Sequence, residues 1–307
     1  RFQAMASSTV LAEALGARLR ICWEPQDVLP VQASEVFSAS FCDDRIISAE
    51  QAQDEFGATR AGTPHYLHRD QGRGHITLAG HDRGEQAFMP DLQRLLLETE
   101  PIRALVIAAG GQFLLPGTTQ PGNDAQADFR SRRRSFYAQM PFRDETEAAV
   151  SRALAERCEF IGLHLRYSDR AHQAPLDRSI RTALRASADA SGITSVFIAS
   201  DTAAARDRWA DESTRLGLDP WFISHDSLAR SNAEGSRAAL VDWRVLANAQ
   251  RLVYFAESSF AVEAAVAGPG FDDSIALGTS RVRMARVRST ELARAAATYP
   301  RRHGWIS

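Results

Sequence analysis

The sequence of 307 residues contains no lysine, so all of its 36 basic residues are arginine. A GC-rich coding bias accounts for this simply. It leaves every permanent side-chain cation as a planar guanidinium, which suits phosphates and carboxylates. The formal net charge of -2 is unlike that of a dedicated nucleic-acid-binding protein, which is normally basic.

Cysteines are few, and long apolar runs are missing. Cys22, Cys42 and Cys158 are odd in number and widely spaced, which indicates neither a disulfide framework nor a metal site. Cys22 lies in an apolar run and is expected to be a buried thiol. No stretch approaches the about 18 consecutive apolar residues of a membrane-spanning helix. We therefore expect a cytoplasmic protein with neither membrane nor nucleic acid as a partner.

Three common catalytic motifs are also missing. The sequence has no G-x-x-x-x-G-K-[ST] loop, and no G-x-G-x-x-G segment follows an expected strand. It has no G-x-S-x-G turn either. These absences argue against a P-loop nucleotidase, an ordinary NAD-binding enzyme and a serine hydrolase.

What the second half does contain is a regular alternation of helices and strands. Short apolar runs predict strands at "FIGLHLR", "SVFIA", "WFIS", "RLVYFA" and "SIALG". Between them, helical spacing predicts helices near 144–156, 177–190, 202–217, 237–249 and 260–268. Strands that alternate with helices predict an α/β fold with parallel sheets.

The first half is less regular. The sequence opens inside an expected helix that Gly16 ends, which favours a start that lacks an upstream strand and turn. A strand stopped by Pro25 and a polar, irregular region to about residue 90 should follow. A helix at "DLQRLLLET" and a strand at "IRALVIAAGG" come next. Residues 114–134 are rich in Pro, Gly and polar residues and predict a loop. We expect an N-terminal domain at 1–140, a C-terminal domain at 141–290 and a tail at 291–307.

The strand Phe160–Arg166 carries the first candidate site. Its alternation puts His164 and Arg166 on one face, opposite Ile161, Leu163 and Leu165. A covered arginine needs an anionic partner. That partner could be Asp169, in a structural ion pair, or the diphosphate of a ligand.

Two other strand ends carry polar clusters, and ligands of parallel sheets bind at such ends. Ser200 and Asp201 follow "SVFIA", while Glu257, Ser258 and Ser259 follow "RLVYFA". Either cluster could simply cap the next helix. Alternatively, Asp201 could bind a ribose or a base, and the two serines at a helix N-terminus could bind phosphate.

Taken in order, these segments resemble the motifs of the GDP-fucose-dependent fucosyltransferase superfamily. This group includes alpha-1,2-, alpha-1,6-, nodulation-factor and protein O-fucosyltransferases. "IGLHLRYSD" looks like its His-x-Arg segment, "VFIASD" like its second motif, and "LVDWRVLANAQRLVYFAESSFAVEAA" like its third. "RFQAMASSTVLAEALGARLRICWEP" and "SFYAQMPFRDETEAAVSRAL" are similar to segments of the first domain and of the entry into the second. Tyr167 departs from the alpha-1,2/alpha-1,6 branch, which has a second arginine there.

The resemblance implies a GT-B fold, with two Rossmann-like domains whose parallel sheets face a cleft. It implies an inverting, metal-independent glycosyltransferase that moves a sugar, most simply L-fucose, from a GDP-sugar to a hydroxyl of a carbohydrate, peptide or small molecule. The GDP-sugar is a substrate, and no cofactor is implied. The matching positions make Arg166, His164 and Asp169 the catalytic candidates. The donor-binding candidates are His164, Arg166, Ser200, Asp201, Asp242, Ser258, Ser259, Phe260 and Arg1.

Several alternatives remain open at this point. The general base could be Asp169, His172, Asp177, His68 or Asp70. The irregular residues 55–90 and 112–136 are expected to line the acceptor side. The same scaffold could also serve a nucleotide-sugar hydrolase, another repurposed enzyme, or a catalytically silent nucleotide-binding protein.

Overall fold

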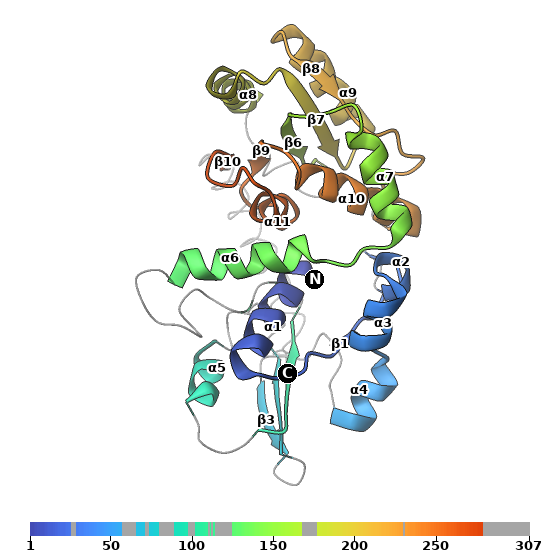
Figure 1. The fold of residues 1–307 in the computed structure, drawn as a ribbon, viewed down its shortest axis with the longest axis vertical. Helices are drawn as coiled ribbons and strands as arrows, with labels where there is room; N and C mark the ends of the chain where they lie inside the picture. The colour runs from blue at the N-terminus through green and yellow to red at the C-terminus, as the bar shows by residue number, and fades with distance from the viewer. Residues whose placement is uncertain are drawn as a thin grey trace, which may run out of the picture. The chain divides into compact units, whose positions relative to one another are not determined.

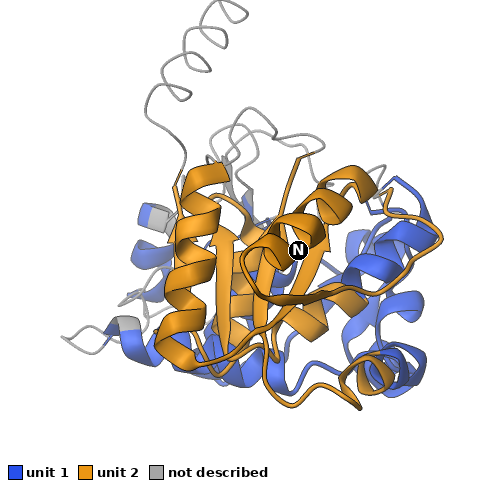
Figure 2. Ribbon diagram, turned by 90° about the horizontal axis from the view of Figure 1, so that it is seen from above, with its two compact units in different colours: residues 1–149, 231–240 blue, residues 150–230, 241–307 orange. Residues whose placement is uncertain are grey.

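The chain divides into two compact units in the computed structural model (Figure 1). The structure describes residues 1–25, 29–56, 66–70, 74–79, 89–97, 102–109, 111, 113, 125–167, 177–229 and 231–278. Figure 2 shows unit 1, which comprises Arg1–Ala149 and Ser231–Leu240, and unit 2, which comprises Val150–Arg230 and Val241–Ser307. The domain limits expected from the sequence at 140 and 290 stay a prediction, and the expected tail lies outside the described residues.

Unit 2 is built on a parallel sheet of five strands in the order β10-β9-β6-β7-β8. The strands are β6 (Ile161–Leu165), β7 (Ser195–Ser200), β8 (Asp219–Trp221), β9 (Arg251–Phe255) and β10 (Ile275–Leu277). The predicted strands are confirmed except the one at 221–224, which lies earlier, at β8. Continuous apolar runs mark β6, β7 and β9 because central strands of a parallel sheet are covered on both faces.

The helices of the second half of the chain follow the predicted alternation. They are α7 (Asp144–Leu154), α8 (Asp177–Ser191), α9 (Ala203–Arg215), α10 (Ala233–Leu246) and α11 (Ser259–Ala267). The division between the units falls within α7 and within α10. After α9, Gly217 adopts a left-handed φ of 78°, a conformation that glycine reaches without steric cost.

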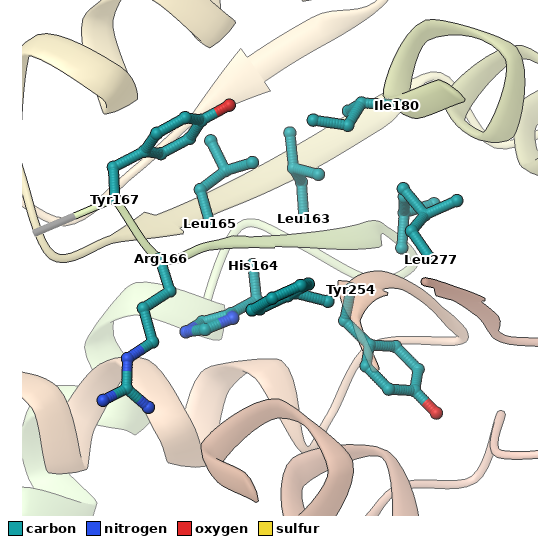
Figure 3. A pocket seen from close by; sticks show the side chains of 10 residues that line it. Leu163, His164, Leu165, Arg166, Tyr167, Ile180, Tyr254 and Leu277 are labelled. Atoms are coloured by element: carbon teal, nitrogen blue, oxygen red, sulfur yellow. The ribbon is translucent and has the colours of Figure 1, made fainter. Parts of the chain in front are cut away.

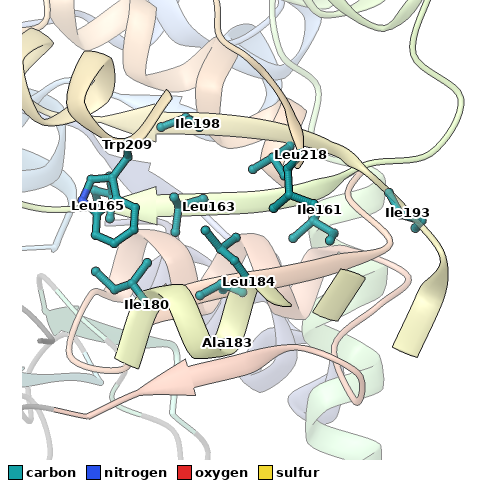
Figure 4. Close-up of a cluster of buried hydrophobic side chains, with 12 residues drawn as sticks. Ile161, Leu163, Leu165, Ile180, Ala183, Leu184, Ile193, Ile198, Trp209 and Leu218 are labelled. Carbon is teal, nitrogen blue, oxygen red and sulfur yellow. The ribbon is translucent and has the colours of Figure 1, made fainter. Parts of the chain in front are cut away.

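The two faces of β6 are covered differently. Ile161, Leu163 and Leu165 project into a core that α8 and α9 close, and Figure 4 shows these side chains beside Ile180, Leu184 and Trp209. Full burial of each such side chain contributes about 1.5–3 kcal/mol. On the other face, a Cβ at Gly162 would come within 2.9 Å of Leu246 Cδ2 and 3.3 Å of Ala249 Cβ. Glycine therefore lets the end of α10 approach the strand closely.

Unit 1 begins with α1 (Phe2–Leu15), which Gly16 ends with a left-handed φ of 59°, as predicted. Two short parallel strands follow, β1 (Ile21–Cys22) and β2 (Ile46–Ile47). The helices α2 (Ala33–Val36), α3 (Ala39–Arg45) and α4 (Ala49–Phe56) accompany them. An aromatic cluster fills this region, with the rings of Trp23 and Phe37 edge-to-face at 5.5 Å.

A second sheet completes unit 1. Its strands are β3 (Tyr66–Asp70), β4 (His75–Ala79) and β5 (Ala104–Ala108); β4 pairs antiparallel with β3 and parallel with β5. The helices α5 (Met89–Leu96) and α6 (Ala125–Ala138) belong to the same region. Val10, Leu11, Leu78, Leu92, Phe113 and Phe129 share one buried cluster. The predicted helix and strand at α5 and β5 are confirmed.

Three expectations for the first half are wrong. Residues 25–90 are not an irregular region throughout, because they include α2, α3, α4, β3 and β4. The loop expected at 114–134 becomes helix α6 from Ala125 on, while residues 114–124 lie outside the described part. Arginines interrupt the apolar residues in the sequence of α6 and obscure its helical pattern, although Phe129 and Tyr137 are buried. The third is Cys22, which is exposed rather than buried because β1 is only two residues long.

Candidate functional site at the strand ends of unit 2

His164 and Arg166 leave β6 on the same side, as the alternation predicted. Figure 3 shows both side chains on the side opposite Leu163, Leu165 and Tyr167. His164 is 8% exposed, and its ring stacks on that of Phe260 with centroids 5.0 Å apart. Arg166 is half-buried at the point where the strand ends. A guanidinium and an imidazole therefore lie together at the carboxyl end of a central strand.

Phe260 belongs to the first turn of α11, the helix that follows β9. Ser258 is the N-cap residue of this helix, yet its side chain makes no capping hydrogen bond. Its hydroxyl is fully buried and has no hydrogen-bond partner among the described residues. Ser259 is exposed beside it. The first backbone N–H groups of a helix have no partner within that helix and favour anions. The capping explanation for Ser258 thus fails, and a buried hydroxyl without a partner among the described residues lies at the start of α11.

The helix α10 connects these two elements. Trp243 donates a hydrogen bond from Nε1 to the carbonyl oxygen of Phe260 at 3.1 Å. Trp243 is 1% exposed, and the hydrogen bond is partly buried. Since Phe260 in turn stacks on His164, the order β6–α11–α10 is fixed by direct contacts.

The end of β7 is organised by hydrogen bonds within the chain. Thr202, and neither Ser200 nor Asp201, caps α9, because its hydroxyl accepts from the backbone N–H of Ala205. Ser200 Oγ accepts from the backbone N–H of Thr202 at 3.3 Å. Asp201 Oδ1 accepts from the backbone N–H of Tyr167 at 2.8 Å and so joins the ends of β6 and β7. Both expected ligand residues therefore have structural contacts at the strand ends.

Asp242 of α10 has a partner that the sequence did not indicate. His225, which follows β8, lies with Nε2 2.8 Å from Asp242 Oδ1, and both side chains are 11% exposed. Burial raises the pKa of the Asp242 carboxyl, while the hydrogen bond from His225 and the charge of Arg206 partly offset the rise. His225 lies before α10 and Asp242 lies within it, so no local sequence pattern could pair the two residues. The signal that could have found His225 was its place directly after the apolar run "WFIS".

The strand order itself marks a binding position between β6 and β9. From β6 the chain proceeds outward to β7 and β8, and it then returns to β9 and β10 on the other side. In open parallel sheets, ligands bind at such a reversal, beyond the carboxyl ends of the strands. The pairing of β6 with β9 stops at Leu163 and Val253, whereas β6 stays paired with β7 to Leu165. The two strands therefore separate next to His164.

A pocket lies where these strands separate, and it is lined mainly by apolar residues of β6, β9, β10 and α8 (Figure 3). It has room for about one water molecule, so it is too small for a nucleotide. Tyr167 points away from His164 and Arg166 and packs against the aliphatic core. Tyr167 therefore does not take the place, on the His164 side, of the second arginine that the alpha-1,2/alpha-1,6 branch has at this position.

The other candidate residues are distributed as follows. Asp169 and His172 lie outside the described residues, as do the side chains of His68 and Asp70. Asp177 forms an ion pair with Arg208 of α9. None of the general-base candidates is thus brought to the His164 cluster within the part of the chain that the structure describes.

Arg1 is found in unit 1, at the start of α1. Its guanidinium lies over the Trp23 ring, 4.7 Å from the centroid. Burial lowers the pKa of this guanidinium, an effect that the charge of Glu24 opposes. A role for Arg1 in donor binding stays a prediction.

The described residues include no group of three or more His, Cys, Asp or Glu side chains placed to hold a metal ion. No helix among them is both long and apolar enough to pass through a lipid bilayer.

Comparison with known proteins gives matches at the level of structure. No family model matches the sequence, and no curated protein is similar to it by sequence. Fucosyltransferase NodZ from Bradyrhizobium matches with a TM-score of 0.53 at 15% identity, over 91% of this chain and 93% of that one. NodZ has also been solved after soaking with GDP-fucose. A variant of Arabidopsis thaliana FUT1 in complex with GDP matches with a TM-score of 0.59 at 15% identity, over 87% and 65%. POFUT1 in complex with GDP matches with a TM-score of 0.52 at 12% identity, over 90% and 94%.

These matches confirm the predicted fold class and the resemblance at the level of the fold. The chain has the α/β fold of GT-B fucosyltransferases, which bind GDP or GDP-fucose in the solved examples. Identities of 12–15% carry the fold alone. Activity has to be argued from the site.

Proposed function

We propose that the protein is an inverting glycosyltransferase that transfers a sugar, L-fucose as the first choice, from a GDP-sugar to a hydroxyl acceptor without a metal ion. The observation that carries this proposal is the cluster of Arg166, His164 and Ser258 at the chain reversal between β6 and β9. Its groups are those that a diphosphate needs, namely a guanidinium, a hydroxyl and a helix N-terminus.

The charge that must be stabilised during the reaction develops on the leaving group. The acceptor oxygen forms a bond to C1 of the sugar as the bond from C1 to the diphosphate oxygen breaks, and the electron pair of that bond leaves with GDP. The proton of the acceptor hydroxyl passes to a general base, for which Asp169 is the first candidate. Negative charge grows on the diphosphate, and preorganised donors that meet this charge lower the barrier.

Each residue has a role in this scheme. Arg166 binds the diphosphate through its planar fork, and Ser258 donates its hydroxyl beside the N-terminus of α11, joined by Ser259 and Phe260. His164, held by stacking on Phe260 at 5.0 Å, orients the diphosphate. Asp201 and Asp242 are the candidates for ribose and base recognition, with Ser200 supporting the end of β7. Arg1 is a further candidate for the diphosphate.

The test uses the purified chain and GDP-fucose. We expect GDP release that depends on an added acceptor, and a product whose anomeric configuration, read by NMR, is opposite to that of the donor. A panel of oligosaccharides, peptides and small hydroxyl compounds supplies the acceptors. GDP release at the same rate without an acceptor would show a hydrolase. GDP binding without turnover across the panel would favour a silent binding protein.

A further inference from the structure

The small pocket between β6 and β9 is a feature of unit 2 that the diphosphate cluster does not account for (Figure 3). The pairing of these two strands ends at Leu163 and Val253. Residues of both strands at and beyond this pair line the pocket, together with Ile180 of α8 and Leu277 of β10. The pocket has room for about one water molecule, so a ligand could place only a small group in it.

The pocket is lined by residues from both faces of β6. Leu165 belongs to the face that packs into the core under α8 and α9, whereas His164 and Arg166 project on the opposite side. All three residues line the pocket. It therefore lies beside the groups that bind the diphosphate in the proposed function. Since the sugar of the donor is bonded directly to that diphosphate, the sugar would lie next to the pocket.

The lining of the pocket is mainly apolar. Ile180 and Leu277 contribute aliphatic side chains from α8 and β10. Tyr167 and Tyr254 also line it, but their hydroxyl groups point away from β6 in Figure 3. A hydroxyl that is buried without a hydrogen bond costs free energy, whereas a methyl group gains from the same burial. The pocket thus suits a methyl group, which is close to a water molecule in size.

A void left by imperfect packing is the alternative. Protein interiors contain few voids as large as a water molecule, and an apolar void deprives its lining of contacts. The core around this pocket is otherwise closely packed, because Ile180 is 1% exposed and Leu165 is 3% exposed. A space beside the diphosphate cluster, in a core of this kind, is better explained by an apolar group that enters with a ligand.

We propose that this pocket receives the methyl group that the transferred sugar carries on C5, so that the protein selects 6-deoxyhexoses such as L-fucose. This inference rests on the proposed function and deepens it. Ile180 and Leu277 are then specificity-determining residues that contact the methyl group. L-Galactose differs from L-fucose by a hydroxyl on this carbon, and D-arabinose in its pyranose form differs by the absence of the carbon.

The experiment uses three donors that differ only at this carbon, namely GDP-L-fucose, GDP-L-galactose and GDP-D-arabinose. Their affinities are measured by calorimetry, with GDP as the reference that has no sugar. We expect the wild type to bind GDP-L-fucose about tenfold more tightly than GDP-D-arabinose, as for one methyl group in an apolar pocket. It should bind GDP-L-fucose about 100-fold more tightly than GDP-L-galactose, whose extra hydroxyl would be buried without a partner.

Leu277 supplies the variants, because it is half-buried at the end of the edge strand β10, where a substitution should leave the fold intact. Leu277→Ala enlarges the pocket and should reduce the preference for GDP-L-fucose over GDP-L-galactose about tenfold. Leu277→Phe fills the pocket and should abolish the preference for GDP-L-fucose over GDP-D-arabinose. GDP affinity should be the same in both variants as in the wild type.

Ile275→Ala is the matched control. Ile275 lies two residues before Leu277 on the same face of β10, and both side chains are half-buried and pack against the same core. Ile275 is not among the residues that line the pocket. Ile275→Ala should therefore change neither of the two preferences.

The outcomes separate this inference from the function on which it rests. Equal wild-type affinities for the three GDP-sugars would overturn the inference and leave the proposed function in place. Unchanged preferences in the Leu277 variants, or the same changes in Ile275→Ala, would also overturn it. If the wild type bound neither GDP nor any of the GDP-sugars, the proposed function itself would fail. Should Leu277→Phe not fold, Leu277→Ala against Ile275→Ala decides the question.

Discussion

The two faces of β6 differ in their residues and in the elements that they contact. On one face Ile161, Leu163 and Leu165 pack into the core under α8 and α9. On the other, Gly162 lets α10 approach closely, His164 stacks on Phe260 of α11, and Arg166 projects from the same side. The first face stabilises the fold by burying apolar area, while the second carries a histidine and an arginine in place of apolar side chains. Substitutions on the first face should therefore change folding, and those on the second should change binding and turnover.

The largest effect is expected on the apolar face. Leu163 is 1% exposed, and Leu163→Ala leaves a cavity that should lower the free energy of unfolding by about 2–5 kcal/mol. Urea denaturation measures this loss. GDP affinity at a temperature where the variant stays folded should be unchanged. A weakened GDP affinity without a loss of stability would reverse the roles of the two faces.

Arg166→Ala tests the polar face. Loss of one donor to the developing diphosphate charge should raise the barrier to transfer by about 3–4 kcal/mol, with weaker GDP binding and an intact fold. Arg166→Lys should also fail, because one ammonium cannot replace a bidentate fork. The measurements are kcat with GDP-fucose and calorimetry with GDP. Arg181→Ala, on α8 at the apolar face, is the control, and unaltered GDP affinity in Arg166→Ala would refute the assignment.

Two buried serines offer a matched pair across the sheet. Ser258 of the polar face and Ser213 of α9 are both fully buried, with hydroxyls that have no partner among the described residues. Ser258→Ala should weaken GDP binding by about 1.5–3 kcal/mol, the value of a hydrogen bond to a charged group. Ser213→Ala should leave binding unchanged. Similar GDP affinities for the two variants would remove Ser258 from the site.

Asp242→Asn should produce a small gain in stability that depends on pH. Because burial raises the pKa of Asp242 despite the hydrogen bond from His225, the folded chain binds this proton more tightly than the unfolded chain. The stability from this proton is complete below the unfolded pKa and is lost as the pH rises through the folded pKa. The variant should melt above the wild type at pH 8, and the difference should shrink as the pH falls. A difference that grows at low pH would contradict the sign.

The smallest expected effect is that of metal removal. In the proposed function Arg166 and the N-terminus of α11 bind the diphosphate, whereas a site for Mg²⁺ would use one or two carboxylates close to it. Transfer and GDP affinity should therefore persist in excess EDTA, measured before and after addition of Mg²⁺ or Mn²⁺. A strict requirement for either ion would show that Asp201 or Asp169 has been misread.

The contrast between the faces also explains what could be predicted from the sequence. Alternation along β6 assigned His164 and Arg166 to one side, because a strand has a period of two residues. The place of Ser258 between an apolar strand and a helix pointed to that residue, and the resemblance added Asp242 by motif order. The hydrogen bond that the backbone N–H of Ala205 donates to Thr202, and the one between His225 and Asp242, were not predictable, since they depend on which ends lie together in space. Helix α6 was missed because its arginines mask the i, i+4 spacing of its buried residues.

One hydrogen bond at the strand ends can report whether a nucleoside is bound. The amide of Tyr167 donates to Asp201 Oδ1 at 2.8 Å, just beyond the last residue of β6. An amide held in this way exchanges with solvent deuterium only when the contact opens. If a ribose takes over the Asp201 carboxylate, the Tyr167 amide loses its acceptor and its exchange quickens, while neighbouring amides of β6 slow down. One proton can thus distinguish a nucleoside from a bare diphosphate, and it does so without any turnover.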